Sequence, residues 1–236
     1  MKIAPGIAML PLTAGEGRAF NAAVIWDEQD VVLVDTGLPM MQTVIKTALE
    51  ELGIPFARLN RVIITHHDTD HLGSLPELLN TAQKITVMAH ALEKPFIEGT
   101  EHLLVKIEKP IQSLPPAQQE ERRQDYLNRK TVTVDRPLVD GEELPYCGGI
   151  VVIHTPGHTP GHICLYHKPS KTVIVGDATV AEAGRLQGPS PIFTVDMAEA
   201  KQSLKKLLDY EIDQIICYHG GLVNENVREQ LQAVTV

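Results

Sequence analysis

The sequence has few cysteines and no long hydrophobic run. Its three cysteines, Cys147, Cys164 and Cys217, lie far apart among 236 residues. Such spacing forms neither a disulfide framework nor a CxxC site, and it fits a reducing compartment. No apolar run approaches the ~20 residues that a transmembrane helix needs. The N-terminal residues, with one lysine and an early proline, make a poor signal peptide. We therefore expect a cytoplasmic protein without a membrane partner.

Basic charge is also scarce, with 21 Lys and Arg against 30 Asp and Glu and a formal net charge of -9. Proteins that bind nucleic acid usually present a basic face. The densest basic cluster, at 122–123 and 129–130, is interrupted by acidic residues and is interpreted as a solvated helix face. We expect a small-molecule substrate and no nucleic-acid partner, and we leave a homodimer open.

The chain is 43% hydrophobic, which is enough to bury the core of one large domain. Short apolar, β-branched runs predict strands at 22–26, 31–34, 61–65, 84–88, 131–134, 150–153, 163–166, 172–175 and 214–217. Amphipathic patterns predict helices at 41–52, 198–208 and 223–233. Strands and helices that alternate in this way predict an α/β chain.

One arrangement occurs twice along the chain. A strand ends in Asp35 or Asp177, a helix follows, and the next strand ends in His66 or His219. Strand-helix-strand units can look alike by chance. Alternatively, two related halves direct their strand ends at one shared site, since ligands are commonly carried on loops at strand ends.

The segment 91–130 differs from the rest of the chain. It shows no strand pattern, two helical-looking pieces and a break at Pro115-Pro116. A long insertion in a compact domain is often a lid or a binding segment. The competing interpretation is a surface insertion that has no functional role.

The strongest chemical signal is the segment His66-His67-Asp68-Thr69-Asp70-His71, in which five of six side chains can bind a metal ion. It directly follows a predicted strand and leads through Leu72-Gly73 into a predicted helix from Leu75. Neighbouring side chains in a tight strand-to-helix turn can diverge toward two metal ions. A polar loop explains one or two such residues but not five, so the segment predicts a metal site.

Three later motifs carry further candidate ligands. Thr155-Pro156-Gly157-His158-Thr159-Pro160-Gly161-His162 contains two prolines and two glycines, which fix the backbone of a turn. Gly176-Asp177 and Tyr218-His219-Gly220-Gly221 each follow a predicted strand. A stiff turn and two strand ends are suitable places to hold ligands at set distances.

Together these motifs, in their order from Asp35-Thr36-Gly37 to His219, resemble the metallo-β-lactamase superfamily. The resemblance implies a four-layer αββα sandwich, a single α/β domain over 1–236 with a lid insertion at about 91–130. It also implies a site at one edge, between the two sheets.

The resemblance further implies a role for each motif residue. His66, Asp68 and His158 would hold a first metal ion, and Asp70, His71 and His219 a second, with Asp177 bridging the two. Asp35 would brace the loop behind the ligands. His67 falls at a position that does not bind metal, and we expect it to be partly exposed. The remaining histidines are expected to be structural or supporting; they are His162, His90, His102, His154 and His167.

The chain departs from the usual family segment, His-x-His-x-Asp-His, at one position, because Asp68 stands where the second histidine is common. Carboxylate oxygens can bind zinc as well as iron or manganese. We therefore expect two divalent ions, zinc before iron or manganese, with the first site the weaker assignment.

The resemblance implies a metal-dependent hydrolase in which a metal-bound hydroxide attacks the carbonyl of a small ester, lactone or thioester. Asp70 would orient the nucleophile and pass a proton to the leaving group. Segments 91–130 and 179–191, the latter expected to be a loop, would select the substrate. Two other classes stay open: a non-haem iron oxidoreductase similar to sulfur dioxygenases, since two histidines and a carboxylate can hold iron, and a non-catalytic metal-binding member.

Overall fold

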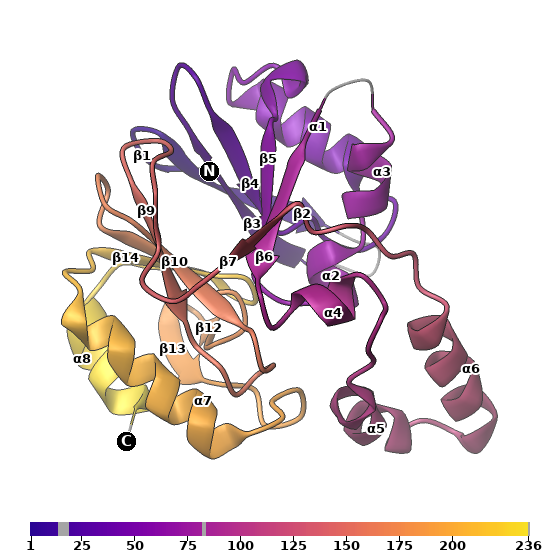
Figure 1. Ribbon diagram of the computed structural model, residues 1–236. Coiled ribbons are helices and arrows are strands. Elements are labelled where there is room, and N and C mark those ends of the chain that lie inside the picture. The colour runs from indigo at the N-terminus through magenta and orange to yellow at the C-terminus, as the bar shows by residue number, and fades with distance from the viewer. Residues whose placement is uncertain (14–18, 82–83, 236) are drawn as a thin grey trace.

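Two β-sheets face each other at the centre of the molecule (Figure 1). The computed structural model describes residues 1–13, 19–81 and 84–235. The first sheet has the order β1-β2-β3-β4-β5-β6-β7, formed by Lys2–Ala4, Ile7–Thr13, Ala19–Trp26, Val31–Val34, Arg61–Ile64, Thr86–His90 and Arg136–Leu138. The second has the order β15-β14-β11-β10-β9-β8, formed by Gly221–Val223, Gln214–Cys217, Thr172–Ile174, Ile163–His167, Ile150–His154 and Glu143–Leu144.

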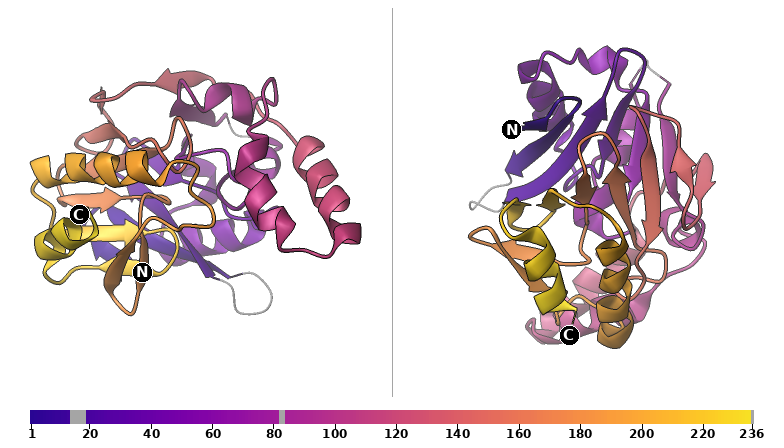
Figure 2. Two further views of the ribbon diagram at one scale, coloured as in Figure 1. Left: turned by 90° about the horizontal axis from the view of Figure 1, so that it is seen from below. Right: turned by 90° about the vertical axis from the view of Figure 1, so that its left-hand side faces the viewer.

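Helices cover the outer face of each sheet, which makes the expected four-layer αββα sandwich (Figure 2). Helices α1 (Gln42–Glu51) and α3 (Leu75–Leu79) pack on the first sheet. Helices α7 (Met197–Leu204) and α8 (Val227–Val234), with the 3-10 turn η3 (Lys205–Asp209), pack on the second. A shorter 3-10 turn, η2 (Phe56–Arg58), precedes β5. The predicted fold class is confirmed.

The continuous apolar runs of the central strands follow from this layering. In β4, Val31 and Leu33 enter the core beneath the helices, while Val32 and Val34 enter the core between the sheets. Successive side chains of a strand point to opposite faces, so a strand buried on both faces is apolar at every position. All four residues are fully buried.

Both strand-helix-strand units pair in parallel. Val32 of β4 lies opposite Arg61 of β5, and Thr172 of β11 lies opposite Gln214 of β14. Parallel strands end at the same edge of a sheet, and this places the loops after β4 and β5 together and the loops after β11 and β14 together.

Three predictions differ from the structure. Residues 131–134 form no strand, because side chains of α4 (Lys94–Ile97) and the residue after it bind this backbone: Lys94 donates to the Val134 carbonyl, and Glu98 accepts from its amide. The predicted helix 223–233 begins only at Val227, since β15 pairs with β14 before it. The expected loop 179–191 contains the hairpin of β12 (Val180–Glu182) and β13 (Arg185–Gly188).

The segment 91–130 forms α4, α5 (Leu104–Gln112) and α6 (Pro116–Leu127), with α6 beginning at the predicted proline break. Helices α5 and α6 project beyond the sheets at one end of the molecule (Figure 1). Arg123 of α6 binds Glu108 of α5 through two hydrogen bonds of 2.8 and 2.9 Å. Whether the segment acts as a lid stays a prediction.

None of the helices within residues 1–13, 19–81 and 84–235 combines the length and apolar character required to cross a bilayer.

Candidate metal centre

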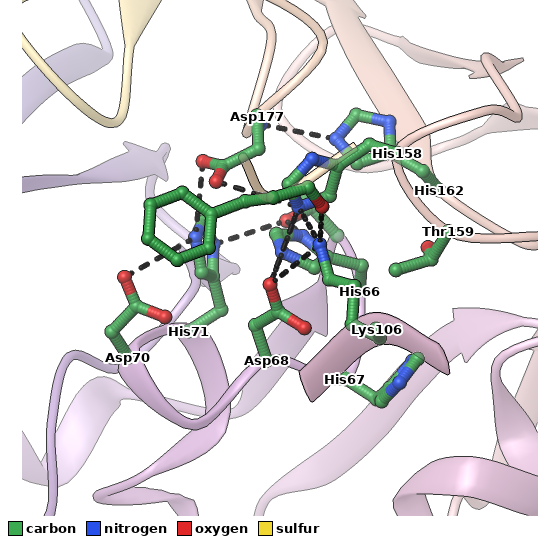
Figure 3. A network of polar contacts seen from close by, with 12 residues as sticks. His66, His67, Asp68, Asp70, His71, Lys106, His158, Thr159, His162 and Asp177 are labelled. Atoms are coloured by element: carbon green, nitrogen blue, oxygen red, sulfur yellow. Dashed lines mark hydrogen bonds and ion pairs between the residues drawn. The ribbon is translucent and has the colours of Figure 1, made fainter. Parts of the chain in front are cut away.

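The segment from His66 to His71 lies where β5 ends, at the edge between the two sheets. Its second half forms the short helix α2 (Thr69–Leu72). His66 and His71 are fully buried, whereas the Asp68 and Asp70 side chains are 19% and 27% exposed. The histidines are therefore more deeply buried than the carboxylates, and the side chains of both kinds converge on one place, as Figure 3 shows.

Four side chains form a first ligand group: His66, Asp68, His158 and Asp177. Each offers one donor atom, and these atoms lie within 4.8 Å of one another. The Nε2 atoms of His66 and His158 are 3.1 Å apart. Asp68 Oδ2 lies 3.3 Å from both of them. Two imidazoles and a carboxylate at this spacing can surround a divalent ion.

Asp70, His71 and His219 form a second ligand group beside the first. Asp70 Oδ2 lies 3.3 Å from His219 Nε2 and 3.9 Å from His71 Nε2. The His219 side chain is 34% exposed, whereas His66 and His158 of the first group are buried. The second group is therefore more accessible to solvent.

The carboxylate of Asp177 lies between the two groups. Its Oδ1 is 3.1 Å from His71 Nε2, and its Oδ2 is 3.5 Å from His158 Nε2 and 3.4 Å from His219 Nε2. The two carboxylate oxygens of Asp177 are therefore placed to bind an ion in either group. The structure thus brings together all seven residues that the sequence suggested as ligands; their binding of metal stays a prediction.

Buried donor atoms show that a cation suits this place. Among the described residues, His71 Nε2 and Asp177 Oδ1 are buried and make no hydrogen bond, although they lie 3.1 Å apart as an ion pair, and buried polar atoms without hydrogen bonds are costly unless an ion binds them. Burial opposes the charged form of His71, yet the carboxylates of Asp177, Asp35 and Asp70 raise its pKa well above the usual value. The local potential is therefore negative, and the residues fit divalent metal ions.

Asp35 braces the second group from behind. Its carboxylate accepts hydrogen bonds from the Thr65 amide and hydroxyl, both at 2.8 Å, and from His71 Nδ1 at 2.9 Å. The last contact fixes the tautomer of His71 and leaves Nε2 free for an ion. The Tyr218 ring packs on the His71 ring with the ring centroids 3.8 Å apart and the planes tilted by 31°, and its hydroxyl donates to the Asp70 carbonyl.

His67 is fully buried, which corrects the expectation of a partly exposed turn residue. The reason is Glu93, also fully buried, whose carboxylate binds the His67 amide and Nδ1 at 2.9 and 2.5 Å. The same carboxylate accepts from the Thr159 hydroxyl and the Gly161 amide at 2.7 and 2.8 Å. Glu93 thus joins the loop after β5 to the turn that carries His158.

Sequence reasoning missed Glu93, although a signal existed. It lies three residues after β6 ends at His90, and so it is a further acidic residue at a strand end. Burial raises the pKa of Glu93, but His67 and the hydrogen bonds from Thr159 and Gly161 outweigh this effect and leave the pKa below its ordinary value.

His162 supports Asp177 and does not join either ligand group. Its Nδ1 lies 2.9 Å from the Thr155 hydroxyl, and its Nε2 accepts the Asp177 amide at 3.1 Å. Burial lowers the pKa of His162 to about 3, which matches a neutral ring. Gly176 is required between them, because a Cβ there would come within 2.8 Å of His162 Nε2 in a left-handed backbone.

The other histidines lie outside the two ligand groups. His90 and His154 stack with their ring centroids 4.1 Å apart. His167 Nε2 lies 3.0 Å from the Cys147 carbonyl oxygen. His102 packs edge-on against Tyr126.

Lys106 of α5 also reaches the first group, and the sequence analysis did not single it out. Its ammonium lies 3.0 Å from Asp68 Oδ2 and 2.7 Å from His158 Nε2, and it donates to the Phe193 carbonyl. Burial raises the pKa of Asp68, but Lys106 and His66 outweigh it and hold this pKa well below its usual range. No pattern in the sequence distinguishes this lysine from the exposed Lys109 on the same helix.

A cavity of about 1100 Å³ opens above the two groups. Its floor includes Asp68, Asp70, Asp177 and His219. Apolar side chains of the sandwich and of α5 and the loop after it line its walls; they include Phe20, Leu38, Met40, Leu72, Ile107, Ile111 and Leu114. Charged residues of α6 and the segment after it, among them Arg122, Arg129 and Lys130, also line the cavity. A mostly apolar pocket with a few polar groups is typical of a small-molecule site.

The chain resembles known proteins in both sequence and fold. Residues 16–219 match the family model described as the metallo-beta-lactamase superfamily. The chain is similar to the probable metallo-hydrolase YflN of Bacillus subtilis strain 168, at 28% identity over 85% of this chain and 79% of that protein. It is also 30% identical to a hydroxyacylglutathione hydrolase of Pseudomonas savastanoi pv. phaseolicola, over 85% of this chain but only 63% of that enzyme.

Among solved structures, a metallo-beta-lactamase family protein from Thermus thermophilus superposes with a TM-score of 0.77. The match covers 99% of this chain and 79% of the other at 24% sequence identity. A likeness at this identity concerns the fold, and it supports the αββα arrangement described above.

Proposed function

Because the chain belongs to the metallo-β-lactamase superfamily, we propose that it is a metal-dependent hydrolase of small esters, lactones or thioesters whose acyl part is apolar. The observation that carries the proposal is the pair of ligand groups sharing Asp177 at the floor of a largely apolar cavity. The hydroxyacylglutathione hydrolase relative, named for a thioester substrate, favours a thioester within this class.

The metal ions, zinc before iron or manganese, would supply a hydroxide nucleophile near neutral pH and polarise the carbonyl that it attacks. His66, Asp68 and His158 would hold one ion and Asp70, His71 and His219 the other, with Asp177 shared. The chain's own residues then set the geometry. Asp35 fixes the His71 ring, and His162 fixes the Asp177 backbone.

Asp70 is the candidate for proton transfer. Its carboxylate borders the cavity and is 27% exposed, so a substrate on the cavity floor can reach it. From there it would orient the attacking oxygen and deliver a proton to the leaving group. The apolar walls would hold the acyl part and exclude water from the reacting end.

The charge of the chain bears on its partners, and the α4–α6 segment bears on its substrate. The acidic chain would act on a small molecule in the cytoplasm, with neither nucleic acid nor membrane as a partner, and a homodimer is compatible with it. The α4–α6 segment would select the substrate, since Ile107, Ile111 and Leu114 line the cavity.

A hydrolysis panel on purified protein tests the proposal. Protein stripped with a chelator and reloaded with zinc or manganese should hydrolyse lactones, thioesters or esters with apolar acyl groups, and the stripped protein should not. His158→Ala should abolish this activity, while His102→Ala, an exposed histidine on the lid side, should retain it. Metal-loaded protein inactive on the whole panel would refute the proposal. Iron retained after anaerobic purification, together with oxygen consumption, would instead establish the oxidoreductase class.

A further inference from the structure

Lys106 lies where a metal ion of the first group would be bound. Most residues of helix α5 are exposed or half-buried, yet Lys106 is only 5% exposed and is one of the two buried residues of that helix, with Ile111. Burying a lysine is unfavourable unless its ammonium is paired. The contacts around Lys106 therefore need an explanation.

The ammonium is fully satisfied by this site. It has three donors, and it meets three acceptors: His158 Nε2 at 2.7 Å, Asp68 Oδ2 at 3.0 Å and the Phe193 carbonyl. Two of these acceptors, His158 Nε2 and Asp68 Oδ2, belong to the first ligand group and would also bind its metal ion. The side chain and an ion would thus use the same lone pairs.

Both cations cannot bind there at once. A zinc ion lies ~2 Å from nitrogen and oxygen ligands, so an ion on His158 Nε2 and Asp68 Oδ2 would come within roughly 5 Å of the ammonium. Like charges at that separation in a buried site repel strongly. Binding of the ion requires the Lys106 ammonium to leave these two atoms, and its departure removes contacts that hold α5 against the first group.

The charges of the site agree with this exclusion. Asp68, Asp70 and Asp177 supply three negative charges, and Asp35, which binds His71 from behind, supplies a fourth. Two divalent ions neutralise these four charges without Lys106. Two divalent ions with Lys106 still in place would leave an excess of positive charge at the site, which is unfavourable.

We propose that Lys106 is the resident cation of the first ligand group, so that the closed position of α5 and a divalent ion in that group exclude each other. This inference rests on the proposed function, because it concerns the same site. The protein then binds one ion tightly through Asp70, His71, His219 and Asp177. It binds a second only at the cost of releasing α5 from its contacts with Asp68 and His158.

Zinc titration of the full chain, stripped with a chelator and followed with a competing chromophoric chelator, tests the inference without measuring activity. The wild type should bind one equivalent tightly and a second at least tenfold more weakly. Lys106→Met keeps an unbranched side chain, one atom shorter and without the charge, and it should tighten the second equivalent at least tenfold. Lys109→Met is the matched control, because Lys109 is exposed on the same helix and binds the Pro191 carbonyl at 2.8 Å.

A second measurement uses the wild type alone and so does not depend on the folding of a variant. Limited trypsin digestion should cleave within 104–127 faster when two equivalents of zinc are bound than when one is bound. Unchanged cleavage would contradict release of α5.

Other outcomes of the titration overturn the inference in distinct ways. Two equally tight ions in both the wild type and Lys106→Met would show that Lys106 does not compete, and the proposed hydrolase would stand. Weaker binding in Lys106→Met would make Lys106 a ligand instead of a competitor. If neither protein bound zinc, the proposed function would fail together with the inference.

Discussion

The two ligand groups share Asp177 but differ in what surrounds them. The second group is braced from behind, since Asp35 binds His71 and Tyr218 stacks on its ring. The first group is approached from the front by a buried lysine of a projecting helix. The comparison teaches that two similar sets of donors can lie in different surroundings. On our proposals, the second group would hold an ion firmly, whereas the first would exchange the Lys106 ammonium for an ion.

Replacing Asp177, which both groups share, should remove the difference in metal binding between them. Asp177→Asn keeps the shape of the side chain but removes the charge that faces both groups. We expect zinc binding to weaken in both groups and hydrolysis to fall below detection, as measured by elemental analysis and turnover. His219→Ala, by comparison, should weaken the second group alone. An Asp177→Asn protein that kept two ions would show that the groups are independent.

Asp70→Asn should separate metal binding from catalysis. Loss of a positioned acid or base typically lowers turnover by about 10²–10⁴-fold, and we expect a fall of this size in kcat with KM nearly unchanged. Steady-state kinetics on protein of verified metal content provides the measurement. If such protein turned over normally, Asp70 would have no role in proton transfer.

Asp35→Asn should affect one group and spare the other. Replacing a residue that orients a metal-binding histidine typically costs about 10–100-fold in metal affinity. The tight zinc equivalent, assigned to the second group, should weaken by this factor in a chelator competition. Asp209→Asn, an exposed residue after α7, is the control. Equal weakening of both equivalents would mean that Asp35 supports the whole site.

Glu93→Gln should change stability through the contact that joins the loop after β5 to the turn carrying His158. Breaking a buried charged contact typically costs about 3–5 kcal/mol, and urea unfolding should show a loss of this order. Because the pKa of Glu93 is lowered in the folded chain, its contribution is complete above about pH 4.5 and is lost as the pH falls below that value. The difference from wild type should therefore shrink in acid.

Glu101→Gln provides the control for this measurement, because Glu101 is exposed in the same segment. It should leave the unfolding midpoint unchanged at every pH. A constant difference between Glu93→Gln and wild type down to pH 3 would show that the Glu93 carboxylate is not the stabilising group.

The smallest effect is expected at Tyr218→Phe. The substitution removes the hydrogen bond to the Asp70 carbonyl but keeps the ring on His71. A single hydrogen bond contributes about 0.5–1.5 kcal/mol, so thermal unfolding should shift by a few degrees with metal binding retained. A large loss of metal would give Tyr218 a greater share in holding the second group.

The sequence predicted the parts of the site that are local in the chain. Strands at 31–34 and 214–217 have the predicted limits, since continuous apolar runs stand out between polar loops. The candidate ligands, which the structure brings together, could be selected because metal-binding side chains cluster directly after such strands. The alternation of strand and helix predicted an α/β chain, and the family resemblance implied the four-layer sandwich, while the register of the parallel pairs came from the structure.

The parts that were missed depend on partners far away in the chain. Glu93 binds Thr159, 66 residues later, and Lys106 binds His158, 52 residues later. A single glutamate after a strand or a single lysine in a polar helix carries no periodic signal. The strand predicted at 131–134 was wrong for the same reason, since α4 and the glutamate after it occupy its backbone groups.

The long separation of the ligands has a thermodynamic consequence. His66 and His158 are 92 positions apart, yet their Nε2 atoms lie within 3.1 Å. The site therefore exists only in the fully folded chain, and ion binding is linked to global unfolding. A ligand that binds only the folded state stabilises it by about 2.7 kcal/mol at a concentration one hundred times its Kd. The melting temperature of the protein can thus rank candidate metals before any substrate is known.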